Sequence, residues 1–494
     1  MRCLARVIRL TPIWACVALT IAVAPASARV EVTTSPRLQP AFRPGVSDYV
    51  SRCAPDKPLL VTVHASSGER VSVAGRSEHG GDFETKLERQ PGARASIRVR
   101  TPGGASRTYN VRCLPTDFPQ WTFRRGGKPQ AQWYVVTPVK PSRGGYAAVF
   151  DTDGVPVWWL RSPRDYMPWD AKLLDDGLLA IGHNRYSPFG ISPESGYEER
   201  TLGGDLVRLV HTSGSPTDVH DLQRLPNGHF LAITYRPRDN VDLRGYGGPQ
   251  HARVFDGELQ ELTSSGHVVW RWNSAKHFSP SETERAYWYN DAVATPPPRL
   301  RGYDLLHINS VQPDGDGLIV SARHLDAVFR IDRATGNVDW KLGGTFVAGK
   351  SLTVTGTPLG QPPLGGQHDA RTWKDGTLTV YDNRTDDAGQ PPAAERFRIN
   401  TLARTATRIE RITEPDVSIS KWGGSARKLP GGNWVVCWAG APVITEQTPA
   451  GRVLLSLRFT GDERSYRAQP LSPGRLRAAA LRRGMDAMVR SAQR

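Results

Sequence analysis

A glycine turn followed by an apolar strand recurs along the chain from about residue 120 onward. One form of this element occurs at 175–179, 226–231, 316–320, 374–378 and 430–435. A second form, whose strand usually carries Trp, occurs at 153–158, 265–270 and 335–340, with a weaker copy at 450–454. Glycine adopts the positive φ angles that hairpin turns require. The recurrence therefore predicts an all-β chain that is rich in tight turns.

The spacing of these copies limits the architecture. When one degenerate copy is placed in each of the two longest gaps, the chain divides into six units of roughly 50–70 residues. Several short strands per unit at this period predict a six-bladed β-propeller, in which Trp side chains pack between neighbouring blades. A β-solenoid is the competing architecture, although its repeats are usually shorter, and five or seven blades stay open.

Four segments follow from the pattern. We expect a signal peptide over residues 1–28, a small N-terminal β-sandwich domain over 29–118, the β-propeller over 119–470 and a basic C-terminal tail over 471–494. The stretch 277–299 contains three consecutive prolines and interrupts the rhythm, so we expect an inserted loop there. The tail is rich in Arg and Ala, which favours a helix packed on the outside.

The N-terminal segment has the three parts of a secretory signal. Arg2, Arg6 and Arg9 precede an apolar run over 13–23, and Ala26-Ser27-Ala28 offers a cleavage site. A membrane anchor is the alternative, but the run is shorter than the roughly 20 residues that a spanning helix needs. No later stretch is apolar enough to cross a bilayer. The sequence therefore predicts a secreted or periplasmic protein without a membrane span.

The cysteines fit an oxidising compartment. Cys53 and Cys113 flank the strand-like runs of the N-terminal domain, and we predict a disulfide that joins its first strand to its last. The alternative is that both are free and buried. Cys437 lies in an apolar strand between Val and Trp residues, where we expect a buried free thiol.

The formal net charge of +16 suggests an anionic partner without naming it. Three of these charges lie in the signal segment, and the others are scattered, which disfavours a nucleic-acid surface. No glycine-rich phosphate loop followed by Lys-Ser or Lys-Thr is present, so nucleotide-dependent transfer has no support.

Three histidines occupy equivalent places in the repeat. His220, His307 and His368 each lie shortly before a glycine turn and its strand. Equivalent positions on successive blades converge on the central channel of a propeller, so we expect the three imidazoles to face one cavity. The alternative is that each is a hydrogen-bonded structural histidine.

Arg323 follows an apolar strand, and a buried Arg needs an anionic partner. A guanidinium suits sulfate or phosphate oxygens, although pairing with Asp326 or Asp332 is the structural alternative. Three histidines can also hold zinc. We disfavour a metal because Asn309 and Arg323 would lie beside the cation, and we expect no cofactor.

Several motifs together resemble one family, the arylsulfate sulfotransferases. They are Asp218-Val219-His220-Asp221, Leu306–Val311, Ile319–His324, Ile331–Gly344, Gly366–Ala370, Val380–Asn383 and Trp422–Arg427. The resemblance covers about residues 120–460 and implies a six-bladed propeller after a smaller N-terminal β domain. This agrees with the repeat count.

The resemblance implies sulfuryl transfer from an aryl sulfate ester to a phenol, by a ping-pong route through a sulfated histidine and without a nucleotide donor. His368 matches the nucleophile. The groups that hold the sulfuryl oxygens and assist proton transfer match His220, His307, Asn309 and Arg323, and Ser425 is a further polar channel residue. The chain lacks the closely spaced cysteine pair of the best-known bacterial branch, which leaves the acceptor range and the oligomeric state open.

Two other functions remain as alternatives. The same site could hydrolyse aryl sulfates with water as the acceptor, or the propeller could bind an anion or a protein without catalysis. The residues suit sulfuryl-group chemistry because its loose transition state places charge on the equatorial oxygens, where fixed donors stabilise it.

Overall fold

The computed structural model describes residues 30–140, 144–163, 165–185, 190–283, 302–358, 360–385 and 389–493. Its described part consists of strands in eight sheets, three-residue turns of 3-10 helix and one α-helix, so the all-β prediction is confirmed. The predicted signal segment, and most of the predicted loop over 277–299, lie outside the described residues.

The N-terminal part contains two sheets that share one apolar core. The first has the order β1 (Glu31–Ser35), β4 (Leu59–His64), β6 (Asp82–Leu87). The second has the order β2 (Leu38–Gln39), β3 (Asp48–Arg52), β8 (Ser106–Leu114), β7 (Arg94–Arg100), β5 (Arg70–Val73). Alternate residues of β4 and β7 are buried, which is the period of a sheet with one covered face.

The predicted disulfide between Cys53 and Cys113 is present. It joins the end of β3 to β8, which are neighbouring parallel strands. The bridge therefore links the third strand of this part to its last strand, rather than the first to the last as we expected.

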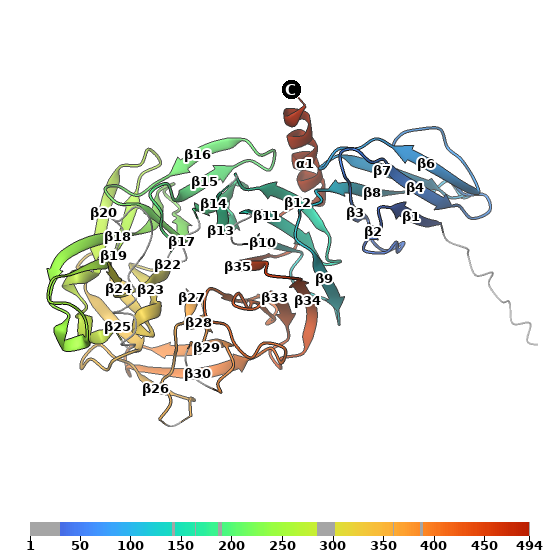
Figure 1. Cartoon of the computed structure of the whole chain (residues 1–494). Coiled ribbons are helices and arrows are strands. Elements are labelled where there is room, and N and C mark those ends of the chain that lie inside the picture. The colour runs from blue at the N-terminus through green and yellow to red at the C-terminus, as the bar shows by residue number, and fades with distance from the viewer. Residues whose placement is uncertain are drawn as a thin grey trace, which may run out of the picture.

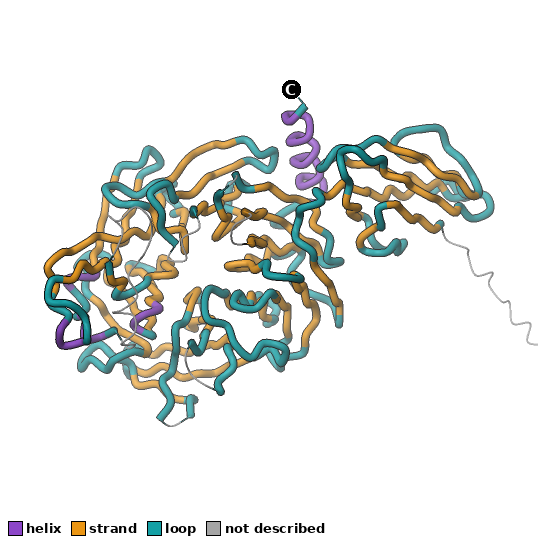
Figure 2. Tube along the Cα trace, viewed as in Figure 1, coloured by secondary structure: helices purple, strands orange, loops and turns teal. Residues whose placement is uncertain are grey.

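Six further sheets surround a common centre (Figures 1 and 2). Their inner strands are β13 (Met167–Leu173), β17 (Thr217–Arg224), β22 (Ile308–Asp314), β27 (His368–Thr372), β31 (Ser425–Lys428) and β35 (Arg464–Leu471). Each inner strand contacts the next, and β31 contacts β35, which contacts β13, so the ring is closed.

Three strands follow outward in each sheet. In chain order they are β10 (Trp133–Lys140), β11 (Gly144–Asp151), β12 (Pro156–Arg161); β14 (Leu179–Asn184), β15 (Gly196–Arg200), β16 (Leu206–Val210); β18 (Phe230–Val241), β19 (Ala252–Leu262), β20 (Val268–Asn273); β23 (Gly317–Ala322), β24 (Ala327–Asp332), β25 (Val338–Gly343); β28 (Thr377–Asp382), β29 (Ala393–Asn400), β30 (Thr405–Ile412); β32 (Trp434–Cys437), β33 (Val443–Gln447), β34 (Val453–Phe459). Short strands β9 (Trp121–Arg125), β21 (Tyr303–Asp304) and β26 (Thr353–Thr355) extend three of these sheets. The 3-10 turns are η1 (Arg244–Tyr246), η2 (Ser274–Lys276), η3 (Pro280–Glu282) and η6 (Arg323–Leu325).

Both ends of this region help to close the ring. The strand β35, which comes last in the chain, pairs with β10 and becomes the inner strand of the first sheet. The early strand β9 pairs with β34 at the outer edge of the last sheet. Strands that are far apart in sequence therefore complete two neighbouring sheets.

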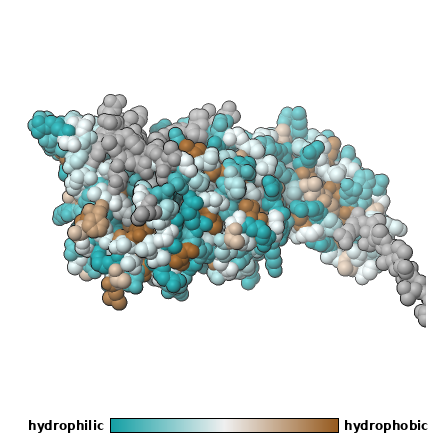
Figure 3. Space-filling model, turned by 90° about the horizontal axis from the view of Figure 1, so that it is seen from below, coloured by the Kyte–Doolittle hydropathy of each residue, from teal (hydrophilic) through white to brown (hydrophobic). Residues whose placement is uncertain are grey.

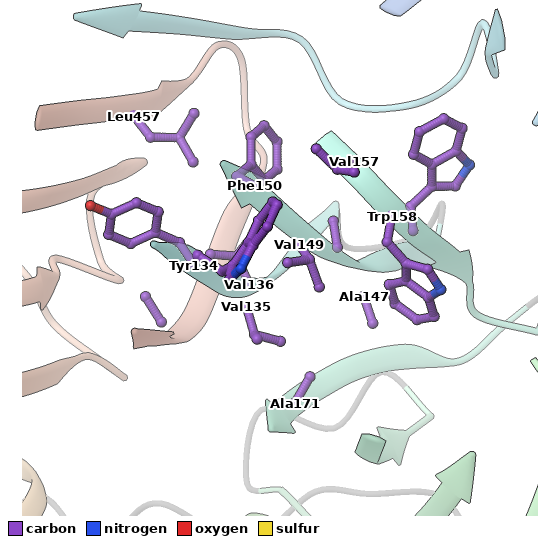
Figure 4. Close-up of a cluster of buried hydrophobic side chains, with 14 of the residues drawn as sticks. Tyr134, Val135, Val136, Ala147, Val149, Phe150, Val157, Trp158, Ala171 and Leu457 are labelled. Carbon is purple, nitrogen blue, oxygen red and sulfur yellow. The ribbon is translucent and has the colours of Figure 1, made fainter. Parts of the chain in front are cut away.

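Apolar side chains fill the space between neighbouring sheets. Figure 4 shows Trp158, Phe150 and Val136 of the first sheet in one cluster with Ala171 of the second. The Trp158 indole donates a hydrogen bond to the Leu202 carbonyl of the next sheet, and Trp270 donates to Arg333 in the same way. These Trp side chains thus lie between sheets, as the repeat predicts.

The C-terminal segment forms the expected helix, α1 (Ala478–Ala492), which lies between the ring and the N-terminal part (Figure 1). Leu481 and Met485 are buried against the first sheet. On its other side Asp486 bonds to Arg94 and Arg112 of the N-terminal part. The helix therefore ties the two parts together. Figure 3 shows a face with hydrophobic residues scattered among hydrophilic ones, and no helix among the described residues is long and apolar enough to cross a membrane.

Candidate active site

Irregular pairing at the inner strands shapes the centre of the ring. The pairing of β13, β17, β22 and β27 with their outer neighbours shifts register, and so does that of β10 with β35. The sixth inner strand, β31, pairs with β32 without a shift. A bulge inserts an extra residue and re-aims its side chain. In β17 and β27 the bulge falls at His220 and just after His368.

The three predicted histidines lie near one another in the centre. The His220 and His307 rings are 4.9 Å apart, and Tyr466 lies 5.4 Å from His220 and 6.2 Å from His368. All three histidines are at most 6% exposed. The repeat therefore located a real cluster, and Tyr466, which the sequence did not indicate, connects its members.

Two of the histidines form pairs with buried aspartates. His220 Nδ1 lies 2.9 Å from both carboxylate oxygens of Asp218, and His307 Nδ1 lies 2.7 Å from Asp304 Oδ2. Because a carboxylate accepts hydrogen bonds, each Nδ1 carries its proton toward the aspartate. The Nε2 atoms therefore lie on the sides of the rings that face away from the carboxylates. Burial, His220 and Arg323 hold the pKa of His307 well below its usual value.

His368 has a neutral partner instead. Its Nδ1 lies 2.8 Å from Asn383 Oδ1, and the Asn383 amide donates to the carbonyls of Ser420 and Gly423, which fixes its orientation. His368 Nδ1 therefore carries the proton, and Nε2 carries the lone pair and accepts a 3.3 Å bond from the Gly423 N–H. Burial, followed by Arg323, His220 and His307, holds the pKa of His368 well below its usual value. A neutral imidazole with a defined lone pair is the arrangement that a nucleophile requires.

Arg323 begins the 3-10 turn η6 and is held by a fourth histidine, His324. His324 Nδ1 donates to the Asp304 carbonyl at 2.6 Å, so its Nε2 accepts from Arg323 Nη1 at 3.0 Å. Arg323 Nη2 also donates to the Lys421 carbonyl. The sequence motif contained His324, but only the fold reveals that it positions the guanidinium. The guanidinium charge contributes to the lowered pKa of His368.

Two predicted residues have other contacts. Asn309 donates through Nδ2 to the carbonyl of Gln367, the residue before His368. Ser425 exchanges hydrogen bonds with the main chain of Ala468 and ties β31 to β35. Asn309 therefore supports the segment that carries the nucleophile candidate, whereas the bonds of Ser425 do not place it among the histidines.

Within the part of the chain that the structure describes, one group of side chains has metal-ligand chemistry, and it consists of Asp304, His307 and His324. Its donor atoms lie within 4.8 Å of one another. However, Nδ1 of His324 is protonated toward a carbonyl, and its Nε2 accepts from the Arg323 guanidinium. A divalent cation would lie beside a fixed positive charge, so the arrangement favours an anion over a metal.

Aromatic side chains form a wall beside the histidines. The Trp169 ring stacks on Tyr466 at 5.2 Å and on Trp422 at 6.2 Å, and it lies 6.1 Å from His220. Trp422 is 37% exposed, so the wall reaches the surface. A stacked aromatic surface next to polar groups suits an aryl ring with a charged substituent. Trp422 begins the sequence motif Trp422–Arg427, directly before Gly423 and Gly424, although the motif alone did not assign it a binding role.

A model of the arylsulfotransferase (ASST) family matches residues 127–471, which is most of the chain. The chain belongs to the arylsulfotransferase family. This confirms the resemblance drawn from the motifs, and membership implies aryl sulfotransferase activity with aryl sulfates and phenols as substrates. No curated protein matches the chain at a significant level.

Two solved structures that match the chain are distant from it in sequence. A protein of unknown function from Bacteroides caccae is 11% identical, with 69% of this chain and 99% of that chain covered and a TM-score of 0.41. The periplasmic gluconolactonase of Pseudomonas aeruginosa is 15% identical, with 75% and 94% covered and a TM-score of 0.34.

Proposed function

We propose that this arylsulfotransferase moves a sulfuryl group from an aryl sulfate ester to a phenol through a covalent intermediate on His368 Nε2. The observation that carries the proposal is the fixed tautomer of His368, whose Nδ1 proton is held by Asn383 while Nε2 keeps its lone pair. The cluster of His220, His307 and Arg323 supplies the remaining groups that the reaction needs.

In the first half-reaction His368 Nε2 attacks sulfur, an N–S bond forms, and the ester S–O bond breaks. Arg323 and the Gly423 N–H donate to the sulfuryl oxygens, where the charge of the loose transition state lies. The departing phenolate takes a proton from Nε2 of His220. We assign this role to His220 because both carboxylate oxygens of Asp218 lie 2.9 Å from its Nδ1, whereas the lowered pKa of His307 favours a neutral ring.

In the second half-reaction the neutral His220 removes the proton from the acceptor phenol. The phenol oxygen attacks sulfur and the N–S bond breaks. This regenerates neutral His368, which still carries its proton on Nδ1. The ring can leave readily because it departs as a neutral imidazole. The wall of Trp169, Trp422 and Tyr466 would hold the aryl ring of donor and acceptor in turn.

The same proposal covers the organisation of the chain. The six sheets of the ring are the blades of a six-bladed propeller over 119–470, and the two N-terminal sheets form a sandwich domain over 29–118. Residues 1–28 direct the chain to a secreted or periplasmic location, which the Cys53–Cys113 disulfide supports.

The test is the intact mass after donor is added without acceptor. A gain of about 80 Da, the mass of SO3, on a peptide containing His368 is expected for a covalent intermediate. The variant His368→Asn should gain no mass and lose turnover, whereas His64→Asn, a change at a solvent-exposed histidine of the N-terminal part, should behave as the parent. Retained turnover in His368→Asn would contradict the nucleophile.

A second measurement separates transfer from hydrolysis. With a nitrophenyl sulfate donor, added phenol should divert the sulfuryl group from inorganic sulfate to phenyl sulfate. A release of free sulfate that phenol leaves unchanged would favour the hydrolase, and no turnover of any aryl sulfate would favour a binding propeller.

A further inference from the structure

A second cluster of charged side chains lies farther along the same six inner strands. Asp170, Asp221 and Asp369 follow Trp169, His220 and His368 directly in sequence, and all three are at most 2% exposed. Four cationic side chains pack around them: Lys172, Arg371, Arg427 and Arg467. The histidines and this cluster thus form two successive layers along the centre of the ring.

A cavity of about 140 Å³ lies in this second layer. Residues from the second halves of the inner strands line it, and all six strands contribute. The charged lining residues are Asp170, Lys172, Arg371, Arg427 and Arg467, and the uncharged polar ones are Gln223, Gln312 and Gln469. The lining is therefore cationic, with four positive side chains and one carboxylate.

The ion pairs of the layer leave one positive charge uncompensated. Lys172 lies 2.6 Å from Asp221 and 2.8 Å from Asp170, and Arg371 lies 2.8 Å from Asp221 and from Asp369. Arg427 shares Asp369 with Arg371. Four cations thus meet three carboxylates. Burial lowers the pKa of Arg427 to about 10, Asp369 opposes this, and Arg371 and Arg467 add to the decrease.

Donors in this layer also lack acceptors. Among the described residues, Arg427 Nε and both Nε and Nη1 of Arg467 are buried without a hydrogen-bond partner. Arg467 is only 4% exposed, and the nearest carboxylate oxygens of Asp221 and Asp369 lie 3.4 and 3.5 Å from it, outside hydrogen-bond geometry. An unpaired buried guanidinium donor is costly, so the layer needs an acceptor.

We propose that this cavity binds one monovalent inorganic anion, such as chloride, between Arg427 and Arg467. A single negative charge cancels the surplus positive charge of the layer. The ion would also accept hydrogen bonds from the N–H groups of both arginines that lack a partner. A divalent oxyanion would overcompensate the charge and would face Asp170 and the unpartnered Oδ2 of Asp369. This site is separate from the histidine layer and does not depend on the proposed transfer reaction.

Bromide provides a direct test in crystals of the full chain. After a bromide soak, an anomalous difference peak is expected in the cavity between Arg427 and Arg467. Arg427→Gln should lose the peak, whereas Arg458→Gln, which removes an arginine of an exposed ion pair with Asp416, should keep it. A wild-type cavity that holds only water, with no anomalous peak, overturns the proposal.

Chloride binding in solution gives an independent test through the ³⁵Cl line width. For the wild type, the excess width should decrease as added chloride saturates the site, because the bound fraction of chloride falls. It should be at background throughout for Arg427→Gln and for Gln312→Glu, which adds a negative charge to the lining. Nitrate should displace the chloride at lower concentration than sulfate does. Equal broadening in all variants, or stronger displacement by sulfate, contradicts a monovalent site, and the wild-type competition decides the matter if a variant fails to fold.

Discussion

Replacing Asp218 by Asn tests the proton-transfer role of His220. Asp218 is fully buried, and both of its carboxylate oxygens lie 2.9 Å from His220 Nδ1. An amide in the same place presents N–H as well as C=O, so it no longer fixes the proton on Nδ1. The change also removes the negative charge that faces the imidazolium.

The expected loss depends on the leaving group. A positioned general acid contributes roughly 10²–10⁴-fold to a rate, which corresponds to about 3–5 kcal/mol of barrier. Phenolate is a stronger base than nitrophenolate and needs the proton more. We therefore expect Asp218→Asn to lower kcat/KM about 10³-fold with phenyl sulfate but only about tenfold with nitrophenyl sulfate.

The assay is transfer to one fixed phenolic acceptor from each of the two donors. Asp304→Asn is the matched control because Asp304 holds His307 in the same manner. It should affect the two donors about equally. Equal losses with both donors in Asp218→Asn would refute the assignment of His220 as the acid.

Three further predictions concern stability and substrate binding. Burial depresses the pKa of three histidines, which are His307, His324 and His368. Below the ordinary pKa of about 6.5 the unfolded chain binds protons that the folded chain does not, so each histidine should lower the free energy of unfolding by about 1 kcal/mol between pH 6.5 and pH 5.5. Urea unfolding at pH 6.5 and 5.5 measures this loss. A free energy of unfolding that stays constant as the pH is lowered would contradict it. Replacing Cys53 and Cys113 by Ser opens a cross-link with a sequence separation of 60 and should cost about 4 kcal/mol, measured by unfolding against the parent under non-reducing conditions. Trp422→Ala shortens the aromatic wall, so KM for aryl sulfates should rise severalfold with a smaller change in kcat, and an unchanged KM would exclude the wall from binding.

Much of the histidine layer was predictable because it follows the repeat. His220, His307 and His368 hold equivalent places before a glycine turn, and the ring brings equivalent places together. Their partners are less regular. Asn383 directly follows β28, which pairs with the strand of His368, and no spacing in the sequence predicts the contact between the two side chains.

Ser425 shows the limit of inference from motif order. It lies at the start of β31, the inner strand whose pairing with β32 shows no register shift. Its hydroxyl donates a hydrogen bond to the main chain of Ala468 in β35. A bulge depends on how two strands pair, so the sequence of one strand alone does not predict it. The second charged layer was missed for a similar reason, because its arginines come from three different strands.

The strand β35 has a consequence for how the protein matures. It carries Tyr466 of the aromatic wall and Arg467 of the second layer, yet it is the last strand to emerge during synthesis. The centre of the ring therefore stays incomplete until this strand has been made and has paired with β10. The helix that follows accepts hydrogen bonds through Asp486 from Arg94 and Arg112 of the N-terminal part, and so holds that part against the closed ring. A chain truncated before β35 would keep all three histidines but would lack Tyr466 and Arg467. We therefore expect such a truncated chain to be inactive.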